Sequence, residues 1–448
     1  MKEKAVAAST YEIFQIEKNG KIVVVTGEDP EGARVPSFDY YESLLSPNIT
    51  AVMSVMDVGG TAQYDKKFDK QGRKGTLSSA LPLTGDVDVR FKIVSKLGTL
   101  DFSNKPLIFD RQINPNQESN REAIIMNLVS KAAKENQTNV VKEKYSGNIA
   151  DIVRKLLKQY LKVSINDGSI TPTKNTTQFA GNSKSVFDIV CWLASQSAPT
   201  DGNPGYFFYE TREGFNFKSI DDLITQKPKE EYTMSGVLRA NLDNNDNDYK
   251  ILLKSNIKSE DLITSLKSGV WQHRVITLDL KERVCKTTVF KFDELKKSLG
   301  KEVDVPDTGG FTRTSFHIKS IGTFEKTPAG KVINDPQEWK AKAIMRYNLL
   351  FSQVIQIQVP CNPQLVAGDT IICNFETVTQ DDKIQGHDPV QSGKYLILNL
   401  CHHFNSVRSF TSLTLVRDSY GLYTNNKSNS GPNNLMSGTT LGLSNTIA

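Results

Sequence analysis

One short stretch constrains the fold more than any other. From Asp86 to Ile93, charged and apolar residues alternate strictly, with apolar side chains at 87, 89, 91 and 93. Successive side chains of a β-strand point to opposite faces, so the pattern predicts a strand with one buried and one solvated face. A second strand is predicted from Asn48 to Met56, between turn-forming residues. Both strands need partners to cover their apolar faces, so we expect an antiparallel barrel or sandwich around the stretch from Ser37 to Lys96.

The length of the chain predicts more than one core. Its 448 residues suggest about three domains. A content of 38% hydrophobic and 23% charged residues is typical of a soluble globular protein. The sequence contains no run of about 18 apolar residues, and its first residues, Met1–Val6, lack the apolar segment of a signal peptide. We therefore expect a protein that is made and assembled in a cytoplasm.

Charge and cysteine content exclude two classes of protein. The formal net charge is only +5, and basic residues are interleaved with acidic ones, as in Lys142-Glu143-Lys144. A dedicated nucleic-acid binder concentrates its basic residues on one element, so we interpret these charges as solvated surface. The five cysteines are widely spaced and odd in number, which favours reduced, mostly buried thiols over a disulfide framework. They are Cys191, Cys285, Cys361, Cys373 and Cys401.

Before the central stretch, the sequence predicts one short strand. It runs from Lys21 to Thr26, after a polar beginning, and a turn-rich connection over 28–32 follows it. Between the strands of the central stretch, the segment from Tyr64 to Ser79 is rich in Lys, Asp, Gly and Ser. We predict that this segment is an exposed loop.

Three helices are predicted after Asp110, where the hydrophobic period changes from 2 to 3.6. The first begins at the capping box Ser119-Asn120-Arg121-Glu122. Its expected apolar face consists of Ile124, Ile125, Leu128, Val129, Ala132 and Ala133. The second follows an Asn148 cap and repeats apolar residues at helical spacing from Ile149 to Leu161. The third follows Ser185, with Val186, Ile189, Val190 and Leu193 facing inward. Together they predict a helical domain inserted between β modules.

The rest of the chain reads mainly as strands. The aromatic segment from Gly205 to Ile220 predicts a hairpin that turns near Arg212-Glu213-Gly214. Strands are expected at 275–280 and 287–292, a short helix from Asp293 to Leu299 and a loop at 308–310. A capped helix begins at Asp335-Pro336. Further strands are expected at 353–359, 370–375, 393–402 and 410–416. After Thr424 the sequence is a polar tail that we expect to be disordered.

The sequence lacks the motifs of the common catalytic sites. We find no phosphate-binding loop, no nucleophile elbow and no H-E-x-x-H helix. The run from Asp243 to Asp248 resembles a calcium loop, but it has Asp248 where such a loop needs glycine and Lys254 where it needs glutamate. We interpret this run as a polar turn. Pairs of catalytic carboxylates distant in the chain are not excluded.

Cys401-His402-His403 is the one cluster that suggests a metal ion. On a strand, Cys401 and His403 share one face while His402 points to the other. Three adjacent residues do not converge on a tetrahedral ion without a bend, and no second ligand pair stands nearby in the sequence. We therefore expect structural packing here, with no metal ligands, no cofactor and no catalytic residues in the chain.

Four separated blocks resemble one protein family, in the family's order. They are Phe38–Pro47 with Leu81–Gly85; Cys191–Ser195 with the hairpin Phe208–Phe215; Ser392–Ile397; and Leu413–Ser419. The chain resembles the central baseplate hub proteins of T-even-like contractile-tailed bacteriophages, whose relatives include the hub part of type VI secretion spikes. The resemblance covers roughly half of the chain.

The resemblance implies an α+β, mainly β fold. Two antiparallel β-barrel domains would have the tail-tube fold, with a helical α+β domain and a smaller insertion between their parts. The implied divisions are 1–115 for the first tube-like domain, 116–225 for the helical insert, 226–242 with 306–424 for the second tube-like domain, 243–305 for the small insertion and 425–448 for the tail.

The resemblance also implies a structural role in the virion and no enzymatic activity. Three copies would form a ring that adapts a trimeric spike below to the sixfold tail tube above. The implied partners are the spike, the tail-tube protein, the tape measure and the wedge proteins, and DNA would pass through the lumen without sequence-specific binding. Two alternatives stay open: a spike-hub protein of a secretion system, and a hub with associated cell-wall-degrading activity.

Overall fold

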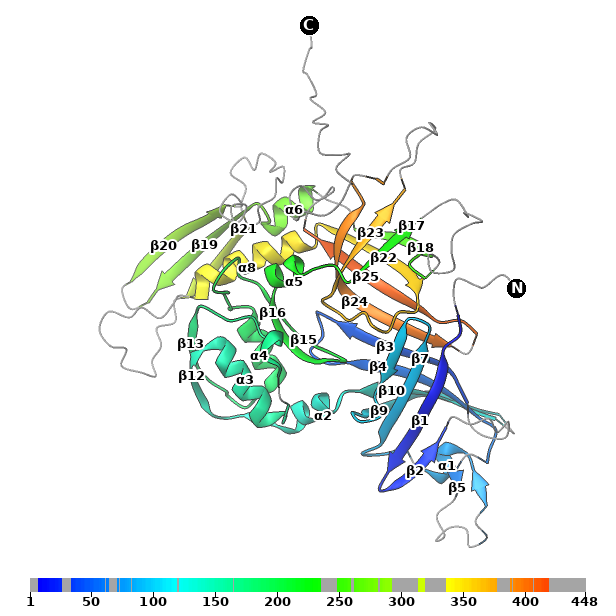
Figure 1. The fold of residues 1–448 in the computed structure, drawn as a ribbon. Helices are drawn as coiled ribbons and strands as arrows, with labels where there is room; N and C mark the ends of the chain where they lie inside the picture. Colours follow the sequence, from blue (N-terminus) through cyan, green and yellow to red (C-terminus); the bar gives the residue numbers. More distant parts are fainter. Residues whose placement is uncertain are drawn as a thin grey trace, which may run out of the picture.

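The structure is a computed structural model. It describes residues 7–25, 34–60, 62–63, 71, 73–81, 83–118, 121–163, 165–234, 248–258, 262–280, 283–291, 313–318, 336–376, 387–388, 390–405 and 407–418. The fold is mainly β, as predicted, and its largest element is one sheet to which both the beginning and the end of the chain contribute (Figure 1).

The first half of this sheet comes from the N-terminal part of the chain. Its strands follow the order β2-β1-β7-β9-β10-β4-β3, and β8 pairs with β7. All these pairs are antiparallel. The strands are β1 (Thr10–Lys18), β2 (Lys21–Val24), β3 (Arg34–Ser43), β4 (Thr50–Asp57), β7 (Asp88–Ser95), β8 (Gly98–Asp101), β9 (Leu107–Glu118) and β10 (Arg121–Val129).

The predicted alternation of charged and apolar residues is confirmed in β7. Val89, Phe91 and Ile93 are fully buried, while the charged residues between them lie on the half-exposed face. Phe91 packs on Phe14 and Phe38, so aromatic rings of three strands form the centre of this core. The apolar face of β7 is thus buried against strands that are distant from it in the sequence.

The second half of the sheet comes from the C-terminal part. Its strands are β17 (Glu230–Met234), β18 (Leu253–Lys258), β22 (Gln353–Pro360), β23 (Thr370–Phe375), β24 (Gly393–Asn405) and β25 (Phe410–Arg417). They follow the order β18-β22-β25-β24, and β23 pairs with β24 and with β17. The strand β24 also pairs with β3 over Asn399–Asn405, which joins the two halves. One hydrophobic core accordingly contains residues of both, such as Phe38 and Phe404.

A helical module with its own core follows β10. It contains α2 (Lys131–Thr138), β11 (Val140–Val141), β12 (Lys144–Asn148), α3 (Ile149–Tyr160), η1 (Asp167–Ser169), β13 (Thr176–Ala180), β14 (Lys184–Ser185), α4 (Val186–Ala194), β15 (Tyr206–Thr211), β16 (Gly214–Ser219) and α5 (Ile220–Thr225). The predicted caps are confirmed, because Asn148 accepts from the Ala150 N–H and Ser185 accepts from the Asp188 N–H. The predicted hairpin is confirmed as β15–β16.

A small three-stranded sheet forms the third unit. It consists of β19 (Gln272–Asp279), β20 (Val284–Lys291) and β21 (Arg313–Ile318), with β19 in the middle. One face packs against α8 (Pro336–Leu350) through Val275, Phe290 and Met345, and the short helix α6 (Leu262–Ser268) lies at its end. Figure 1 shows α8 running between this sheet and the helical module.

The first predicted helix is wrong. The residues from Arg121 to Val129 form β10, which pairs with β4 and with β9. Ile124, Met126 and Leu128 are fully buried, whereas Ile125 and Val129 are half-buried on the opposite face. The spacing of the apolar residues fits a helix. The segment nevertheless pairs with a strand on each side, and its β-branched residues fit a pleated sheet. A helix begins only at Lys131.

Two further expectations about the N-terminal part need correction. The strand β1 was not predicted, although it is central to the first core through Phe14 and Ile16. The segment 64–79 was expected to be an exposed loop, but its described end contains β6 (Lys74–Gly75), which pairs with β5 (Ala62–Gln63), and the short helix α1 (Leu77–Ala80). Leu77 is fully buried.

Strand pairing differs from the domain limits that the resemblance implied. β10 lies inside the first half of the large sheet, so the helical module begins after Val129 rather than at 116. Likewise β18 pairs with β22 in the large sheet, although it falls within 243–305. The strand β21 belongs with β19, beyond that limit. The turn at 28–32, the helix at 293–299, the loop at 308–310 and the tail after 424 lie outside the described residues.

The other predicted strands, the helix after Asp335 and the state of the cysteines are confirmed. Strands at 21–24, 50–57, 272–279, 284–291, 353–360, 370–375, 393–405 and 410–417 match the predicted segments. The cysteines are free thiols, and Cys361, Cys373 and Cys401 are buried. Among the helices that the structure describes, none is both long and apolar enough to cross a membrane.

Candidate functional site

Asp248, the last residue of the run that resembles a calcium loop, forms an ion pair. Asp248 is nearly buried, and its carboxylate lies 2.8 Å from Lys96 Nζ, at the turn between β7 and β8. Residues 243–247 lie outside the described residues. The pair links the N-terminal half of the sheet to the chain that leads into β18, which fits a structural contact.

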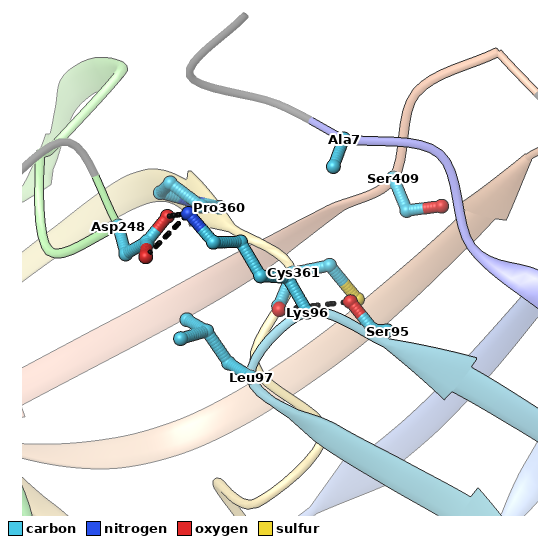
Figure 2. Close-up of a pocket in the computed structure, with 8 residues that line it drawn as sticks. All are labelled: Ala7, Ser95, Lys96, Leu97, Asp248, Pro360, Cys361 and Ser409. Carbon is cyan, nitrogen blue, oxygen red and sulfur yellow. Dashed lines mark hydrogen bonds and ion pairs between the residues drawn. The ribbon is translucent and has the colours of Figure 1, made fainter. Parts of the chain in front are cut away.

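A small cavity lies beside this ion pair (Figure 2). Ser95 and Cys361 line it, and the Ser95 hydroxyl donates to the Cys361 carbonyl over 3.2 Å. Its volume of about 20 Å³ is enough for about one water molecule. An organic substrate does not fit, so we interpret the cavity as a packing defect where the two halves of the sheet meet.

The three residues of the Cys401-His402-His403 cluster divide between two faces, as the sequence predicted. His402 is fully buried; its Nδ1 lies 2.9 Å from the Thr411 hydroxyl and its Nε2 3.3 Å from the Leu365 carbonyl. Burial lowers the pKa of His402 to about 3, so the ring is neutral near pH 7. His402 is therefore a packed core histidine.

The other two residues of the cluster acquire a neighbour that the sequence did not reveal. Cys401 and His403 face the outer side of β24, and the strand β3 places Asp39 directly opposite His403. The His403 Nδ1 lies 2.8 Å from the Asp39 carboxylate and 3.7 Å from the Cys401 sulfur. Because Asp39 is distant in the chain, ligand spacing in the sequence gave no sign of it.

A second buried polar site among the described residues is centred on Glu42 in β3. Its side chain is 2% exposed. One carboxylate oxygen accepts from the Tyr40 hydroxyl and from the Arg212 backbone N–H, both at 2.7 Å, and the other accepts from the Ala367 N–H at 2.8 Å. These donors belong to the first half of the sheet, to the hairpin of the helical module and to the loop after β22. Glu42 therefore links three parts of the chain.

Burial dominates the electrostatics of this junction. It raises the pKa of Glu42 to about 7, although the three hydrogen bonds oppose the shift. Burial also raises the pKa of Glu210 in β15 to about 7, and the Glu210 carboxylate accepts from the Ile49 N–H at 3.1 Å. Both carboxyl groups hold the hairpin β15–β16 against the first half of the sheet.

Close backbone approach completes the junction. The Arg212 guanidinium lies 3.4 Å from the carbonyl of Thr99 in β8 and 3.4 Å from that of Gln364 in the loop after β22. Gly368 adopts a φ of +91°, and a Cβ atom there would meet the Tyr209 hydroxyl. Only glycine suits both conditions. Both carboxylate oxygens of Glu42 accept hydrogen bonds from within the chain, so the geometry suits a cross-link between its parts.

A buried ion-pair network fixes α8. The Arg346 side chain is almost fully buried; its Nε lies 2.8 Å from Asp221 in α5 and its Nη2 3.0 Å from Asp418, just after β25. Asp221 also accepts from the Asn203 N–H at 2.8 Å. This network joins the helical module, the helix α8 and the end of the large sheet.

Exposed apolar side chains concentrate on strands at the margins of the sheets. In β2 and β18, which end the described strand path, Ile22, Val24, Leu253 and Ile257 are each more than half exposed. In the small sheet, Phe316 and Ile318 of β21 are exposed on the face opposite α8, next to Ile276 and Leu278 of β19. Such surfaces favour contacts with other chains.

Known structures share this architecture over nearly its full length. A tail protein from Neisseria meningitidis MC58 superposes with a TM-score of 0.51 at 9% identity, over 92% of this chain and 97% of that one. The 43 kDa tail protein of prophage MuSo2 from Shewanella oneidensis has the same TM-score and identity, over 91% of this chain and 99% of that one. No protein-family model matches the sequence, and no curated protein matches it either.

The protein therefore has the fold of phage tail proteins. The predicted likeness to such proteins and the predicted mainly β fold class are confirmed at the level of the fold.

Proposed function

We propose that this protein is a structural component of a contractile phage tail, namely the central baseplate hub. Three copies form a ring that adapts a threefold spike to the sixfold tail tube. The observation that carries the proposal is the likeness to two tail proteins over more than nine tenths of each chain. The four sequence blocks that resemble hub proteins point to the hub among tail proteins.

The strand edges support assembly with copies of the same chain. The strands β2 and β18 end the path through the large sheet, and each carries exposed apolar residues. A contact between one edge of a copy and the other edge of the next is heterologous, and such contacts generate a ring when the rotation closes. Ring closure also removes edges that would otherwise promote aggregation.

The rigid junction supports a role that depends on geometry. A subunit that mates two symmetries must hold its modules at fixed angles, and Glu42 and Arg346 connect them through buried hydrogen bonds and ion pairs. We propose a first tube-like part up to Val129, a helical module from Ser130 to Thr225, a second tube-like part from 226–258 and 351–424, and between its segments a small insertion with α8.

The proposed partners follow from the hub role. They are a trimeric spike on one side, the tail-tube protein and tape measure on the other, and wedge proteins around the ring. DNA passes through the lumen without sequence-specific contacts. The protein resides in the virion after assembly in the host cytoplasm, and it acts through its interfaces rather than as an enzyme.

The mass of the purified full chain tests the proposal. Light scattering, with and without a trimeric spike protein added as the proposed partner, is expected to give about 150 kDa in at least one condition, three times the 49.9 kDa of one chain. Negative-stain images of that species are expected to show a threefold ring with a pseudo-sixfold face. A monomer in both conditions would rule out the hub.

Two companion assays separate the proposal from its alternatives. A peptidoglycan zymogram is expected to show no clearing, and clearing would indicate a hub with cell-wall-degrading activity. Genes for sheath, tube and wedge proteins of a phage are expected beside this gene. A neighbourhood of secretion-system genes would instead favour the spike-hub protein of such a system.

A further inference from the structure

The outer face of the large sheet brings together three side chains of the kinds that bind transition metals. Cys401 and His403 are two residues apart on β24, so they point to the same side. Across the antiparallel pair, Asp39 on β3 stands opposite His403, and Tyr41 stands opposite Cys401. One sulfur, one imidazole nitrogen and one carboxylate oxygen thus meet on a rigid two-strand platform.

The spacing of these atoms suits a small tetrahedral ion. The sulfur, the ring nitrogen and the carboxylate oxygen all lie within 4.8 Å of one another. Zinc bonds of about 2.0–2.3 Å imply tetrahedral ligand atoms roughly 3.3–3.8 Å apart. The distance of 3.7 Å between Cys401 Sγ and His403 Nδ1 already falls in this range. The 2.8 Å between His403 Nδ1 and Asp39 Oδ1 is a hydrogen-bond distance, and it would widen by about half an ångström as the ion replaces the proton.

The surroundings orient the ligands and leave one side open. The His403 ring stacks on Phe410 with 4.4 Å between ring centroids, which fixes the plane of the imidazole. Cys401 is buried, whereas the side chains of His403 and Asp39 are each about 30% exposed. An ion can therefore enter from solvent, and a water molecule can complete its coordination.

The donor set selects the kind of metal. Calcium and magnesium prefer ligand sets made of oxygen alone. A thiolate with an imidazole and one carboxylate suits zinc and its spectroscopic substitute cobalt. We propose that Asp39, Cys401 and His403 form a zinc site with water as the fourth ligand.

Such a site would link the two ends of the chain. β3 belongs to the N-terminal half of the large sheet and β24 to the C-terminal half, so the ion bridges the strands that join them. An ion that binds only the folded chain stabilises it by mass action. The site does not depend on the proposed hub role, because a single chain supplies all three protein ligands.

Cobalt titration of the reduced, metal-free full chain tests the site. We expect one equivalent of Co²⁺ per chain, with a thiolate-to-cobalt charge-transfer band and the intense visible bands of tetrahedral cobalt. Cys401→Ser is expected to lose the charge-transfer band, and His403→Ala to weaken binding by at least about 100-fold. Zinc is expected to raise the Tm of the wild type but not of Cys401→Ser.

Two further variants keep the test decisive. Cys285→Ser removes an exposed thiol on β20, away from the site, and is expected to bind cobalt like the wild type. Asp39→Asn preserves the size of the side chain and its hydrogen bond to His403, so it is expected to fold but to bind cobalt more weakly. No cobalt band in the wild type, a band that persists in Cys401→Ser, or unchanged affinity in Asp39→Asn would each overturn the proposal.

Discussion

At the scale of single residues, the carboxyl group of Glu42 holds three parts of the chain together. Replacing it by alanine leaves the Tyr40 hydroxyl and the N–H groups of Arg212 and Ala367 without their acceptor. Each buried donor left without a partner costs about 1 kcal/mol or more. We expect Glu42→Ala to lower the free energy of unfolding by about 3 kcal/mol at pH 5.5, as measured by urea denaturation.

A surface glutamate provides the matched control. Glu12 lies on β1 with its side chain 44% exposed, paired with Lys92. Glu12→Ala is expected to change stability by less than about 1 kcal/mol, because exposed ion pairs contribute little. Equal losses in the two variants would show that the Glu42 junction is not a special cross-link.

The effect of Glu42 also depends on pH. Burial raises its pKa from the ordinary 4.5 to about 7, so the folded chain binds the proton more tightly than the unfolded chain. The stabilisation from this group is therefore complete below pH 4.5 and is lost as the pH rises through 7. We expect the difference in unfolding free energy between wild type and Glu42→Ala to shrink by about 2 kcal/mol from pH 5 to pH 8.

Comparing two proteins in this way cancels opposing groups such as His402. The pKa of His402 is lowered by burial, so its contribution changes with pH in the other direction. Tyr40→Phe removes one donor to Glu42 but keeps the carboxyl group, so it is expected to retain a pH dependence of the same sign as that of the wild type. A pH-independent difference for Glu42→Ala would contradict the raised pKa.

At the scale of elements, the apolar residues of β10 fit two hydrophobic periods, that of a helix and that of a strand. A helix would place Ile125 and Leu128 on the same apolar face, whereas the strand buries Leu128 fully and leaves Ile125 half-buried on the other side. We expect Leu128→Ala to cost about 3 kcal/mol in urea denaturation and Ile125→Ala about 1 kcal/mol or less. Similar losses at both positions would favour the helical pattern over the strand.

Elements with local signals were predictable from sequence, and elements defined by partners were not. Asn148 and Ser185 predict where their helices begin, because an N-cap side chain accepts a hydrogen bond from a backbone N–H within the next three residues. β10 was misread because Ile124, Ile125, Leu128 and Val129 fit both spacings, and only pairing with β4 and β9 decides between them. The strand β1 was not predicted, because polar residues precede its buried Phe14 and Ile16 and none of them marks the start of a strand.

The candidate sites show the same limit. The faces of Cys401, His402 and His403 followed from strand alternation alone. The contacts of Asp39 and Glu42 were not predictable in this way, because only the folded sheet brings their partners near. Glu42 bonds to residues 170 and 325 positions away, and Asp39 bonds to a residue 364 positions away. No spacing rule within a sequence reaches that far.

At the scale of the whole molecule, the proposed contact between copies involves the margins of the large sheet, as far as the structure describes it. The strand β2 lies at the end of the described strand order, next to β1, and its residues Ile22 and Val24 are exposed. Charged residues on an edge strand prevent pairing with another chain. We expect the double variant Ile22→Lys, Val24→Lys to remain folded, because neither side chain is buried, and to shift the mass in light scattering from a trimer toward a monomer.

Val140→Lys is the matched control for this prediction. Val140 is also exposed and apolar, but it lies in the two-stranded β11–β14 pair of the helical module. The control adds the same kind of charge away from the sheet margin, so it is expected to keep the trimer. If Val140→Lys dissociates the ring and the β2 variant does not, the helical module rather than the edge strand forms the contact between copies. Circular dichroism of both variants separates a lost interface from a lost fold, since only the second changes the strand signal.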